Sequence, residues 1–388
     1  MLASASDTNE VDGAVRTQFA AGSYARIAGL PVEIDSCEFV PIVRDTSSGF
    51  TKITTVIRLR GGGEEGLGED VTWDQIDHIE FLRHPMPLEL EGSWHLDELS
   101  DALAEADLFP VTPCREASRL YRRWAFESAA LDLGLRQAGL SLAQAVGRTP
   151  RPVRFVASVR LGEPPSIEPL LARLRSDPTL EFKLDPTPSW TLDTIKDIAS
   201  VGRVRTVDLK GHYSNTSFAT PPHPELYARV LDAFPDAWIE DPAITPQTRP
   251  LLAPHIERIA WDAPIHSVAD LQAMPHRPAA LNIKPARFGS LRALFAAYDH
   301  CEANRIPTYG GGNFELGPGR GQLQYLASLF HPDGPNDLAP PGYNMPTPDT
   351  TLPRSPLAPR PHPTGFRWGQ TTLRRSIRDA EQHATVTP

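Results

Sequence analysis

The second half of the chain alternates short apolar segments with helical ones, and this alternation constrains the possible fold most. Strand-like apolar segments occur at residues 154–161, 180–185, 204–211, 237–242, 258–263, 279–285 and 306–311, and a last one is expected near Asp337 and Leu338. Helical segments lie between them. Strands that alternate with helices form right-handed βαβ units and a parallel sheet. Seven or eight units in roughly 190 residues favour a (β/α) barrel, although the pattern alone also allows an open doubly wound sheet.

The first 150 residues predict a smaller α+β domain. Residues 32–43 and 50–60 read as two β segments, of which the second alternates at a period of two and ends at glycines 61–63. An antiparallel pair is implied. From about Trp94 to Gly147 the pattern becomes helical. We therefore expect a helical hairpin on a small sheet, with the first 25 residues or so flexible.

Proline is concentrated near the C-terminus. The chain has 40 prolines, with the densest run between Pro335 and Pro363. Proline removes a backbone donor and fixes φ, so this run predicts an extended segment. Aromatic residues follow this proline-rich run, and they need to be buried against the rest of the protein. We expect a cap at 1–150, a barrel at 151–344 and a tail at 345–388 that returns to the cap.

Composition excludes several classes of protein. With 388 residues, 40% of them hydrophobic, and a mean hydropathy of -0.30, the chain is typical of a globular protein. It contains no apolar run of about 20 residues, and its acidic N-terminus does not resemble an export signal, so we expect a cytoplasmic protein. A net charge of -10 argues against nucleic-acid binding. The cysteines Cys37, Cys114 and Cys301 offer neither a disulfide framework nor a zinc spacing, and we expect all three to be buried.

Ionisable residues end one predicted strand after another. The set comprises Lys183, Asp185, Asp208, Lys210, Glu240, Asp241, Asp262 and Lys284. A single charged residue at a strand end is usually a solvated loop residue or a helix cap. In a parallel barrel, however, all C-terminal strand ends face one mouth, so this series predicts a single site.

Three carboxylates in the series predict a metal centre. Asp208, Glu240 and Asp262 come from successive strands and supply the hard oxygen ligands that Mg2+ prefers, with Mn2+ as a possible substitute. Without a cation they would repel one another and take up protons. Asp241 should point to the other side of its strand and be structural.

A lysine one strand further on predicts a general base. Lysine can act as a base where burial and nearby positive charge lower its pKa from about 10.4 toward neutrality. We therefore expect Lys284 to transfer protons next to the carboxylates.

Other residues are candidates for substrate binding. The glycine-rich segment 310–322 enters a helix, so its backbone amides and Arg320 are expected to hold an anionic group, unless the glycines only make a tight turn. His212 and Tyr213 follow Lys210 on one loop and are expected to line the pocket, although a loop histidine is more often solvated. Residues 46–51 of the cap are a candidate lid.

The ordered series resembles the enolase superfamily, especially its muconate-lactonizing and dipeptide-epimerase-like branch. Residues 61–70 look like the G-x-G-E turn of the cap, and 124–147 like the helix that leads into the barrel. Residues 239–242 look like the second metal-ligand strand, and 282–291 like the sixth strand, which carries the base. The resemblance covers most of the chain. It implies a (β/α)7β barrel with an α+β cap that the C-terminal tail completes.

The resemblance implies roles for individual residues. Asp208, Glu240 and Asp262 would bind Mg2+, and Lys284 would transfer protons. Lys183 matches the first lysine of a K-x-K motif on the second strand, and Glu315 matches an acid that helps to position the substrate carboxylate. We also count Asp185 and Asn313 among the substrate-binding candidates. The implied partners are a small carboxylate substrate and further copies of the chain, as a dimer or an octamer.

The chain departs from the superfamily pattern at two positions. Asp185 stands where the second lysine of K-x-K is expected, and Lys210 stands where the third strand usually has the asparagine of D-x-N. We hypothesise that Lys210 supplies the missing positive charge. Because a racemase needs a proton carrier on each face of the substrate, elimination or cycloisomerisation is favoured.

Three alternatives remain open on the sequence. The chain could be a racemase or epimerase of the same superfamily, or a catalytically silent relative that binds a metal and a small acid. A barrel aldolase that uses Lys284 as a Schiff base is a third possibility, but it leaves the three carboxylates unexplained.

Overall fold

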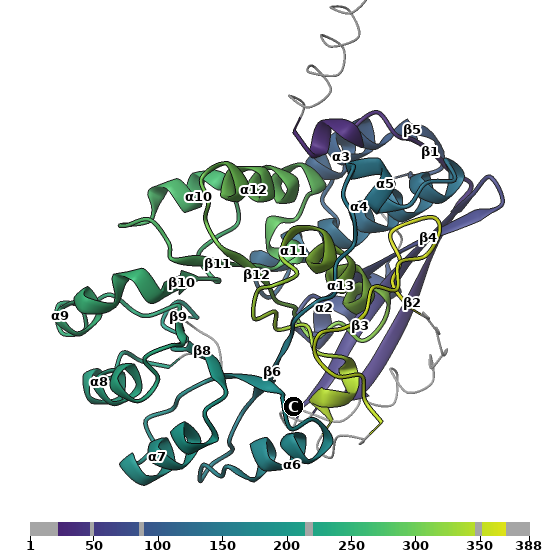
Figure 1. Ribbon diagram of the computed structural model, residues 1–388. Helices are drawn as coiled ribbons and strands as arrows, with labels where there is room; N and C mark the ends of the chain where they lie inside the picture. Colours follow the sequence, from purple (N-terminus) through teal and green to yellow (C-terminus); the bar gives the residue numbers. More distant parts are fainter. Residues whose placement is uncertain (1–21, 47–49, 85–88, 214–219, 346–350, 370–388) are drawn as a thin grey trace, which may run out of the picture.

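The second half of the chain forms a curled sheet of seven parallel strands (Figure 1). The computed structural model describes residues 22–46, 50–84, 89–213, 220–345 and 351–369. Its parallel strands are β6 (Val156–Val159), β7 (Glu181–Leu184), β8 (Val204–Asp208), β9 (Trp238–Glu240), β10 (Ile259–Trp261), β11 (Ala280–Ile283) and β12 (Thr308–Gly310). Each strand lies next to the strand that precedes it in the sequence, as expected for a series of βαβ units.

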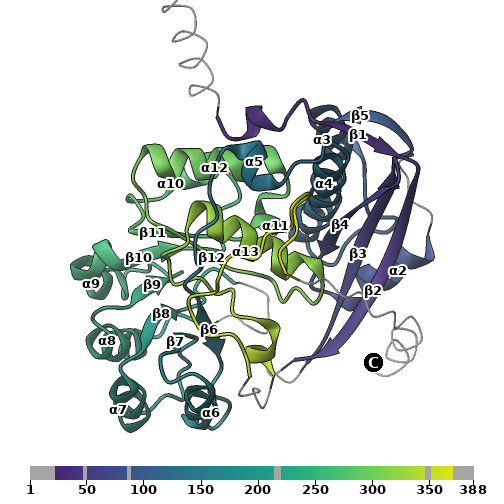
Figure 2. The same cartoon turned by 45° about the vertical axis from the view of Figure 1, so that its right-hand side comes forward.

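Helices cover the outside of this sheet (Figure 2). They are α6 (Glu168–Ser176), α7 (Leu192–Val201), α8 (Pro224–Ala233), α9 (Arg249–Leu252), α10 (Val268–Ala273), α11 (Pro285–Phe288), α12 (Leu291–Ala303) and α13 (Pro318–Phe330). Each of the seven strand segments predicted from the sequence contains one of the observed strands.

The segment expected as the last strand closes the barrel. Asn336 makes a parallel bridge to Phe155 next to β6, and Asp337 makes one to Gly311 next to β12. The Val156 amide donates to the Asn336 carbonyl at 2.8 Å, and the Asp337 amide donates to the Gly310 carbonyl at 2.8 Å. The predicted (β/α)7β barrel is therefore confirmed.

The described residues of the cap form two antiparallel sheets and four α-helices. The strands β2 (Ser36–Asp45), β3 (Thr51–Gly61) and β4 (Glu64–Asp70) form one sheet, and β1 (Pro31–Ile34) pairs with β5 (Gly92–His95) in the other. The helices are α2 (Gln75–Arg83), α3 (Leu96–Glu105), α4 (Ala117–Gln137) and α5 (Leu142–Val146). The short helices η1 (Tyr24–Arg26), η2 (Ala253–Arg258) and η3 (Pro341–Asn344) complete the described chain.

Two predictions for the cap sheet were wrong in detail. Residues 32–43 form parts of two strands in different sheets, because the chain changes partner at Asp35. The second error concerns β4: its residues were expected to belong to a turn because residues 61–70 resemble the G-x-G-E turn of the superfamily, but they form a strand. Its glycines allow α4 to pack closely: a Cβ at Gly66 would lie 2.2 Å from the Ala129 carbonyl oxygen, and one at Gly68 only 1.9 Å from that of Ala125.

The long helix α4 lies between the cap sheet and the returning tail. Asp132 is fully buried on this helix and accepts hydrogen bonds from the amides of Leu67 (2.9 Å) and Phe366 (2.7 Å) and from Nε of Arg367 (2.7 Å). The Phe366 ring packs edge-on against Trp124 of the same helix. The described part of the C-terminal segment therefore packs on the cap.

Two buried carboxylates of the cap bind the N-termini of barrel helices. Glu127 on α4 accepts the Leu291 amide at the start of α12 at 2.7 Å. Glu69 on β4 accepts the amides of Leu316 (2.6 Å), Gly317 (3.0 Å) and Gly319 (2.9 Å) at the start of α13. A carboxylate at a helix N-terminus satisfies unpaired amides and is stabilised by the helix dipole. These contacts fix the cap over the mouth of the barrel.

Some expectations from composition need correction. Cys301 is buried, but Cys37 is half-buried and Cys114 is exposed, so only one of the three cysteines is a core residue. Within the described residues, no helix is both long enough and apolar enough to span a membrane. The expected flexible N-terminus, up to residue 21, lies outside the described residues, as does the centre of the candidate lid at 47–49.

We expect two buried histidines to make the folded protein less stable in acid. Burial lowers the pKa of His78 and of His331 to about 4. In the unfolded chain a histidine has a pKa of about 6.5, so between these values the unfolded state binds more protons than the native state. The free energy of unfolding should therefore fall as the pH drops from about 6.5 toward 4.

Urea unfolding at several pH values measures this slope. His78→Gln should flatten it, whereas the control His84→Gln, whose side chain is 45% exposed, should leave it unchanged. Equal slopes for wild type and His78→Gln would show that His78 does not contribute.

Candidate active site

Three carboxylates meet inside the C-terminal mouth of the barrel. Asp208 and Glu240 are the last residues of β8 and β9 and lie opposite each other in the sheet register. Asp262 directly follows β10. All three are fully buried, and one oxygen of each lies within 4.8 Å of the others. The structure thus brings together the three predicted metal ligands.

Three lysines neutralise these carboxylates. The Lys183 ammonium on β7 hydrogen-bonds to Oε1 of Glu240 and lies 3.1 Å from Oδ2 of Asp208. Lys210 hydrogen-bonds to the same Oδ2 of Asp208. Lys284, directly after β11, lies 2.8 Å from Oδ2 of Asp262. All three predicted catalytic lysines therefore face the carboxylate cluster.

Burial and the neighbouring lysines shift the pKa values of the carboxylates in opposite directions. Burial favours the neutral acid, but Lys210 and Lys183 outweigh it and hold the pKa of Asp208 below its usual range. The pKa of Asp262 is likewise lowered, because Arg287 and Lys284 outweigh burial. Burial dominates at Glu240, where the nearby carboxylates add to it and raise the pKa well above the usual value.

A tyrosine and an arginine complete the surroundings of Asp262. The Tyr213 hydroxyl donates to Oδ2 of Asp262 at 2.8 Å and accepts a hydrogen bond from Nη2 of Arg287 at 2.8 Å. A second nitrogen of Arg287 lies 3.2 Å from Oδ1 of Asp262. The sequence reasoning missed Arg287, although it stands three residues after the predicted base.

Asp241 has the structural position expected for it. Its carboxylate accepts the amides of Asp262 (2.9 Å) and Ala263 (2.8 Å). Burial, together with the charges of Asp262 and Asp208, raises its pKa to about 7. Its hydrogen bonds hold the turn that carries the third carboxylate.

A cavity of about 190 Å³ opens above the cluster, between the barrel and the cap. Its cationic lining residues are Arg115, Arg160, Lys183, Lys210, Lys284, Arg287 and Arg320, and its acidic ones are Asp185 and Asp337. Val71, Trp73 and Tyr121 of the cap cover it. Such a cationic, partly aromatic pocket suits a small anion with an apolar part. The cap residues and Arg160 were not predicted, because no local sequence pattern places them at the barrel mouth.

The two departures from the superfamily pattern lie side by side. The Lys210 ammonium is 3.6 Å from Oδ1 of Asp185, so the acid and the lysine interact across β7 and β8. Arg160, which follows β6, lies 3.3 Å from the other oxygen of Asp185. Lys210 therefore lies next to the residue that stands where the superfamily pattern has a lysine.

The glycine-rich segment after β12 contributes less to the cavity than predicted. Asn313 and Arg320 line it, but Glu315 does not: it accepts the Asn313 amide at 2.6 Å and lies 3.2 Å from Arg320, behind the segment. The amides of residues 316, 317 and 319 bind Glu69 of the cap. The expectation that these amides hold an anionic substrate group was wrong for these three, because a carboxylate of the protein already occupies them.

His212 does not line the cavity as expected. Its side chain is exposed, and its ring packs edge-on against Trp261. At the predicted lid, Phe50 packs against Trp73 and Phe314 with ring centroids 5.2 and 5.4 Å apart. This aromatic contact joins the cap to the β12–α13 segment above the cavity.

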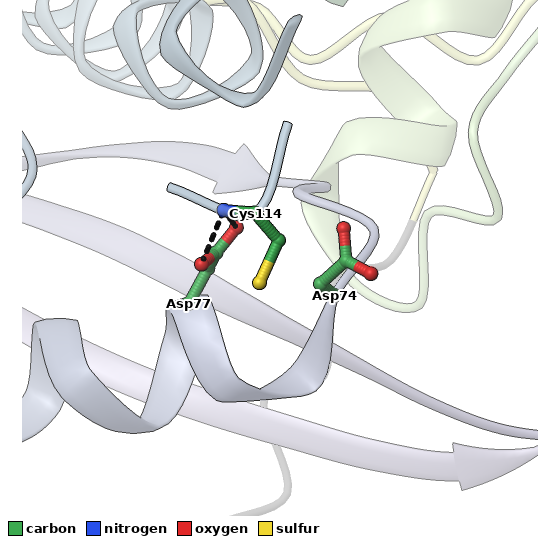
Figure 3. Close-up of side chains that lie close together, drawn as sticks. All are labelled: Asp74, Asp77 and Cys114. Carbon is green, nitrogen blue, oxygen red and sulfur yellow. Dashed lines mark hydrogen bonds between the residues drawn. The ribbon is translucent and has the colours of Figure 1, made fainter. Parts of the chain in front are cut away.

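A second group of potential ligands lies in the cap, at the start of α2 (Figure 3). It consists of Asp74, Asp77 and Cys114. Asp77 accepts the Cys114 amide at 3.1 Å, and Asp74 is bound by Nε of Arg115 at 2.7 Å. Both carboxylates are therefore used to hold the segment before α4, and we assign no metal to this group.

The donor set at the barrel mouth fits a small divalent cation. Mg2+ prefers carboxylate oxygens and keeps positions for water and substrate oxygens. Oδ1 of Asp262 is buried and, among the described residues, accepts no hydrogen bond. With a metal bound, Asp208, Glu240 and Asp262 would be the ligands and the lysine ammonium groups could turn toward a substrate.

Solved structures with the same fold include proteins described as members of the enolase superfamily. The chain matches a muconate cycloisomerase from Pseudomonas fluorescens with a TM-score of 0.60 and 19% identity, covering 91% of this chain and 98% of that one. It matches a dipeptide epimerase from Methylococcus capsulatus, complexed with Mg ion, with a TM-score of 0.59 and 18% identity, covering 86% and 99%.

Sequence relatives point to the same branch. An o-succinylbenzoate synthase from Geobacillus stearothermophilus is 26% identical over 295 residues, which cover 71% of this chain and 74% of the relative. An N-succinylamino acid racemase from Thermus thermophilus is 26% identical over 318 residues, which cover 76% and 81%.

The capped barrel and these relatives define an enzyme of the enolase superfamily, a lyase or an isomerase. Within it, the chain belongs to the family described as "Domain of unknown function (DUF8230)". The N-terminal domain of that family matches residues 25–145, and its C-terminal domain matches residues 149–345.

Removing the Glu69 carboxylate should loosen the joint between cap and barrel. Glu69→Ala leaves three amides at the start of α13 without their acceptor and should lower the free energy of unfolding by about 2 kcal/mol. Chemical unfolding measures the loss. Glu105→Ala, an exposed position on α3, serves as the control, and an equal loss in both variants would contradict the role of Glu69.

Proposed function

We propose that this protein is a Mg2+-dependent enzyme that removes the proton next to the carboxylate of a small acid and forms an enediolate intermediate. The observation that carries the proposal is the meeting of three buried carboxylates, one of which contacts Lys284, a residue that lines the cavity. The metal ligands would be Asp208, Glu240 and Asp262. Enolase-type chemistry in the relatives supports the same conclusion.

The substrate carboxylate would lie between the metal site and the cationic wall of the cavity. A bound Mg2+ supplies positive charge where negative charge develops as the proton leaves. Lys183 carries a second positive charge at the same place, since it bridges Asp208 and Glu240. Arg320 and Asn313 would orient the rest of the substrate from the β12–α13 segment.

Lys284 would accept the proton at Nζ. It lines the cavity, and its ammonium lies against Asp262, so it stands at the edge of the metal site and faces the substrate volume. Arg287 lies against the same carboxylate.

The fate of the intermediate depends on whether a second proton carrier is present. Lys210 lines the cavity from β8 but is held by Asp208 and Asp185. An ammonium held in this way would stabilise charge rather than shuttle protons. We therefore favour elimination or cycloisomerisation, with racemisation or epimerisation as the alternative.

Solvent-deuterium exchange with candidate acids tests the base. Lys284→Ala should lower the Mg2+-dependent exchange rate by at least about 10²-fold, the usual contribution of a general base. Exchange that persists at the wild-type rate in Lys284→Ala would exclude the proposed base.

The same assay separates the possible roles of Lys210. If Lys210 only stabilises charge, Lys210→Ala should slow exchange and turnover together. If it is a second proton carrier, Lys210→Ala should abolish racemisation and leave exchange at one face intact. An unaffected variant would remove Lys210 from the mechanism.

Metal titration tests the ligand set independently of catalysis. Wild type should bind one Mg2+ per chain by calorimetry, and Asp262→Asn should lose most of this affinity because an amide carries no charge. Asp74→Asn, in the cap, should bind as wild type does. Binding of Mg2+ without exchange of any tested acid would favour a catalytically silent relative.

A further inference from the structure

One buried lysine of the chain has no part in the proposed mechanism. The chain contains five lysines and 33 arginines, so arginine supplies most of its positively charged side chains. Three of the lysines meet the carboxylate cluster, and Lys196 on α7 is exposed, with 75% of its side chain accessible. The fifth, Lys52 on β3 of the cap, is buried, with 1% of its surface exposed.

Uncharged groups hold the ammonium of Lys52. It donates hydrogen bonds to the carbonyl oxygens of Thr72 at 2.6 Å and of Val71 at 3.1 Å. It also lies over the ring of Trp73, 5.0 Å from the ring centroid. Two carbonyl oxygens and the face of one ring match the three N–H donors of a lysine. These described partners include no carboxylate.

Lys52 thus contacts three consecutive residues of the segment that covers the cavity. Val71 and Trp73 line the cavity, whereas Lys52, of the described residues, is not part of the lining. Lys52 therefore lies behind this wall. The Trp73 ring also packs against Phe50 and Phe314, with ring centroids 5.2 and 6.1 Å away, so its position affects the contact between cap and barrel.

Stability alone does not account for a lysine at this position. Burying an ammonium group costs free energy because the charge loses its water. An apolar side chain of similar volume is often as stable as a buried charge, or more stable. The cost is understandable if the ammonium of Lys52 fixes a residue that the active site needs.

We propose that Lys52 is a positioning residue that keeps the Trp73 ring on the cavity and so sets the affinity for the apolar part of the substrate. This inference rests on the enzymatic function proposed above. Lys52 does not touch the substrate itself. It acts through the ring of Trp73 and through the backbone of residues 71 and 72.

Kinetics of Lys52→Met with an acid that exchanges its α-proton test this role. Methionine keeps the approximate length of the side chain and removes the charge and the donors. KM should rise about 10-fold, because loss of a buried cation–π contact lowers the share of molecules in which Trp73 lies on the cavity. The change in kcat should be much smaller, because the proposed base and metal ligands are untouched. Lys196→Met, which removes an exposed charge, should match wild type.

A double variant tests whether Lys52 acts through Trp73. Trp73→Leu should raise KM, and Lys52→Met should add no further rise in Trp73→Leu, because the ring through which it acts is gone. Effects on KM that multiply in the double variant would overturn the role of Lys52. An unchanged KM in Lys52→Met, with or without a fall in kcat, would also overturn it.

Tryptophan fluorescence tests the contact without a substrate. Burial lowers the pKa of Lys52 to about 8, although the charges of Asp70, Glu315 and Glu69 oppose this shift. As the pH rises through about 8 the amine becomes neutral and the cation–π contact is lost, so the emission of Trp73 should change. The difference between wild type and Trp73→Leu isolates this tryptophan from the other six. Lys52→Met should lack the transition, and its absence from wild type would overturn the proposal.

One neighbouring acid needs its own control in this titration. Asp74 and His78 also face Lys52, and burial lowers the pKa of His78 to about 4, well below the transition. Burial raises the pKa of Glu69. Glu69→Gln should therefore keep the transition near pH 8 if Lys52 titrates. Loss of the transition in Glu69→Gln would assign it to Glu69 and overturn the contact. These measurements remain possible if Lys52→Met does not fold.

The outcomes separate this inference from the proposed function. If wild type exchanges an acid and Lys52→Met does so with the same KM, the role of Lys52 is overturned and the proposed function stands. If wild type exchanges no acid, the proposed function is removed and the role of Lys52 in substrate affinity with it.

Discussion

Three carboxylates buried within 4.8 Å of one another require positive charge, and this requirement organises the barrel mouth. In the structure Lys183, Lys210 and Lys284 supply it. Balancing three buried acids with three ammonium groups is energetically unfavourable, because each ammonium group must also lose its water. The arrangement is understandable if a divalent cation binds the carboxylates in place of the lysines. The ammonium groups of the lysines then face an anionic substrate.

The cap completes this site and does not merely cover it. Glu127 and Glu69 bind the starts of α12 and α13, the helices that follow the proposed base and the glycine-rich segment. Asp132 binds the returning tail to the same cap. Glu69 and Glu127 thus couple the position of the cap to the geometry of the barrel mouth. The cap in turn contributes Trp73, Tyr121 and Arg115 to the cavity.

The barrel and its strand-end charges were predictable because both follow from local pattern. Apolar runs mark the strands, and an acid or lysine at the end of five consecutive runs marks the mouth. Residues brought in by tertiary packing were not predictable. Arg115 and Trp73 reach the cavity only because the cap docks on the barrel, and nothing in their neighbourhood indicates this.

The errors have the same origin. Residues of β4 were expected in a turn from their resemblance to the G-x-G-E motif. Glycines have low strand propensity, and the close approach of α4 explains why they stand in this strand. The amides after β12 were expected to bind substrate, since a helix start attracts anions. The anion proved to be Glu69, which is about 250 residues away in the chain.

A crystal structure of the protein soaked with Mn2+ tests the central claim most directly, because the anomalous signal locates the ion independently of the protein coordinates. We expect one strong peak that contacts an oxygen each of Asp208, Glu240 and Asp262, with the Lys284 amine turned toward the open side of the ion. A peak at Asp74 and Asp77 instead, or an empty barrel mouth with the lysines still bound to the carboxylates, would contradict the account.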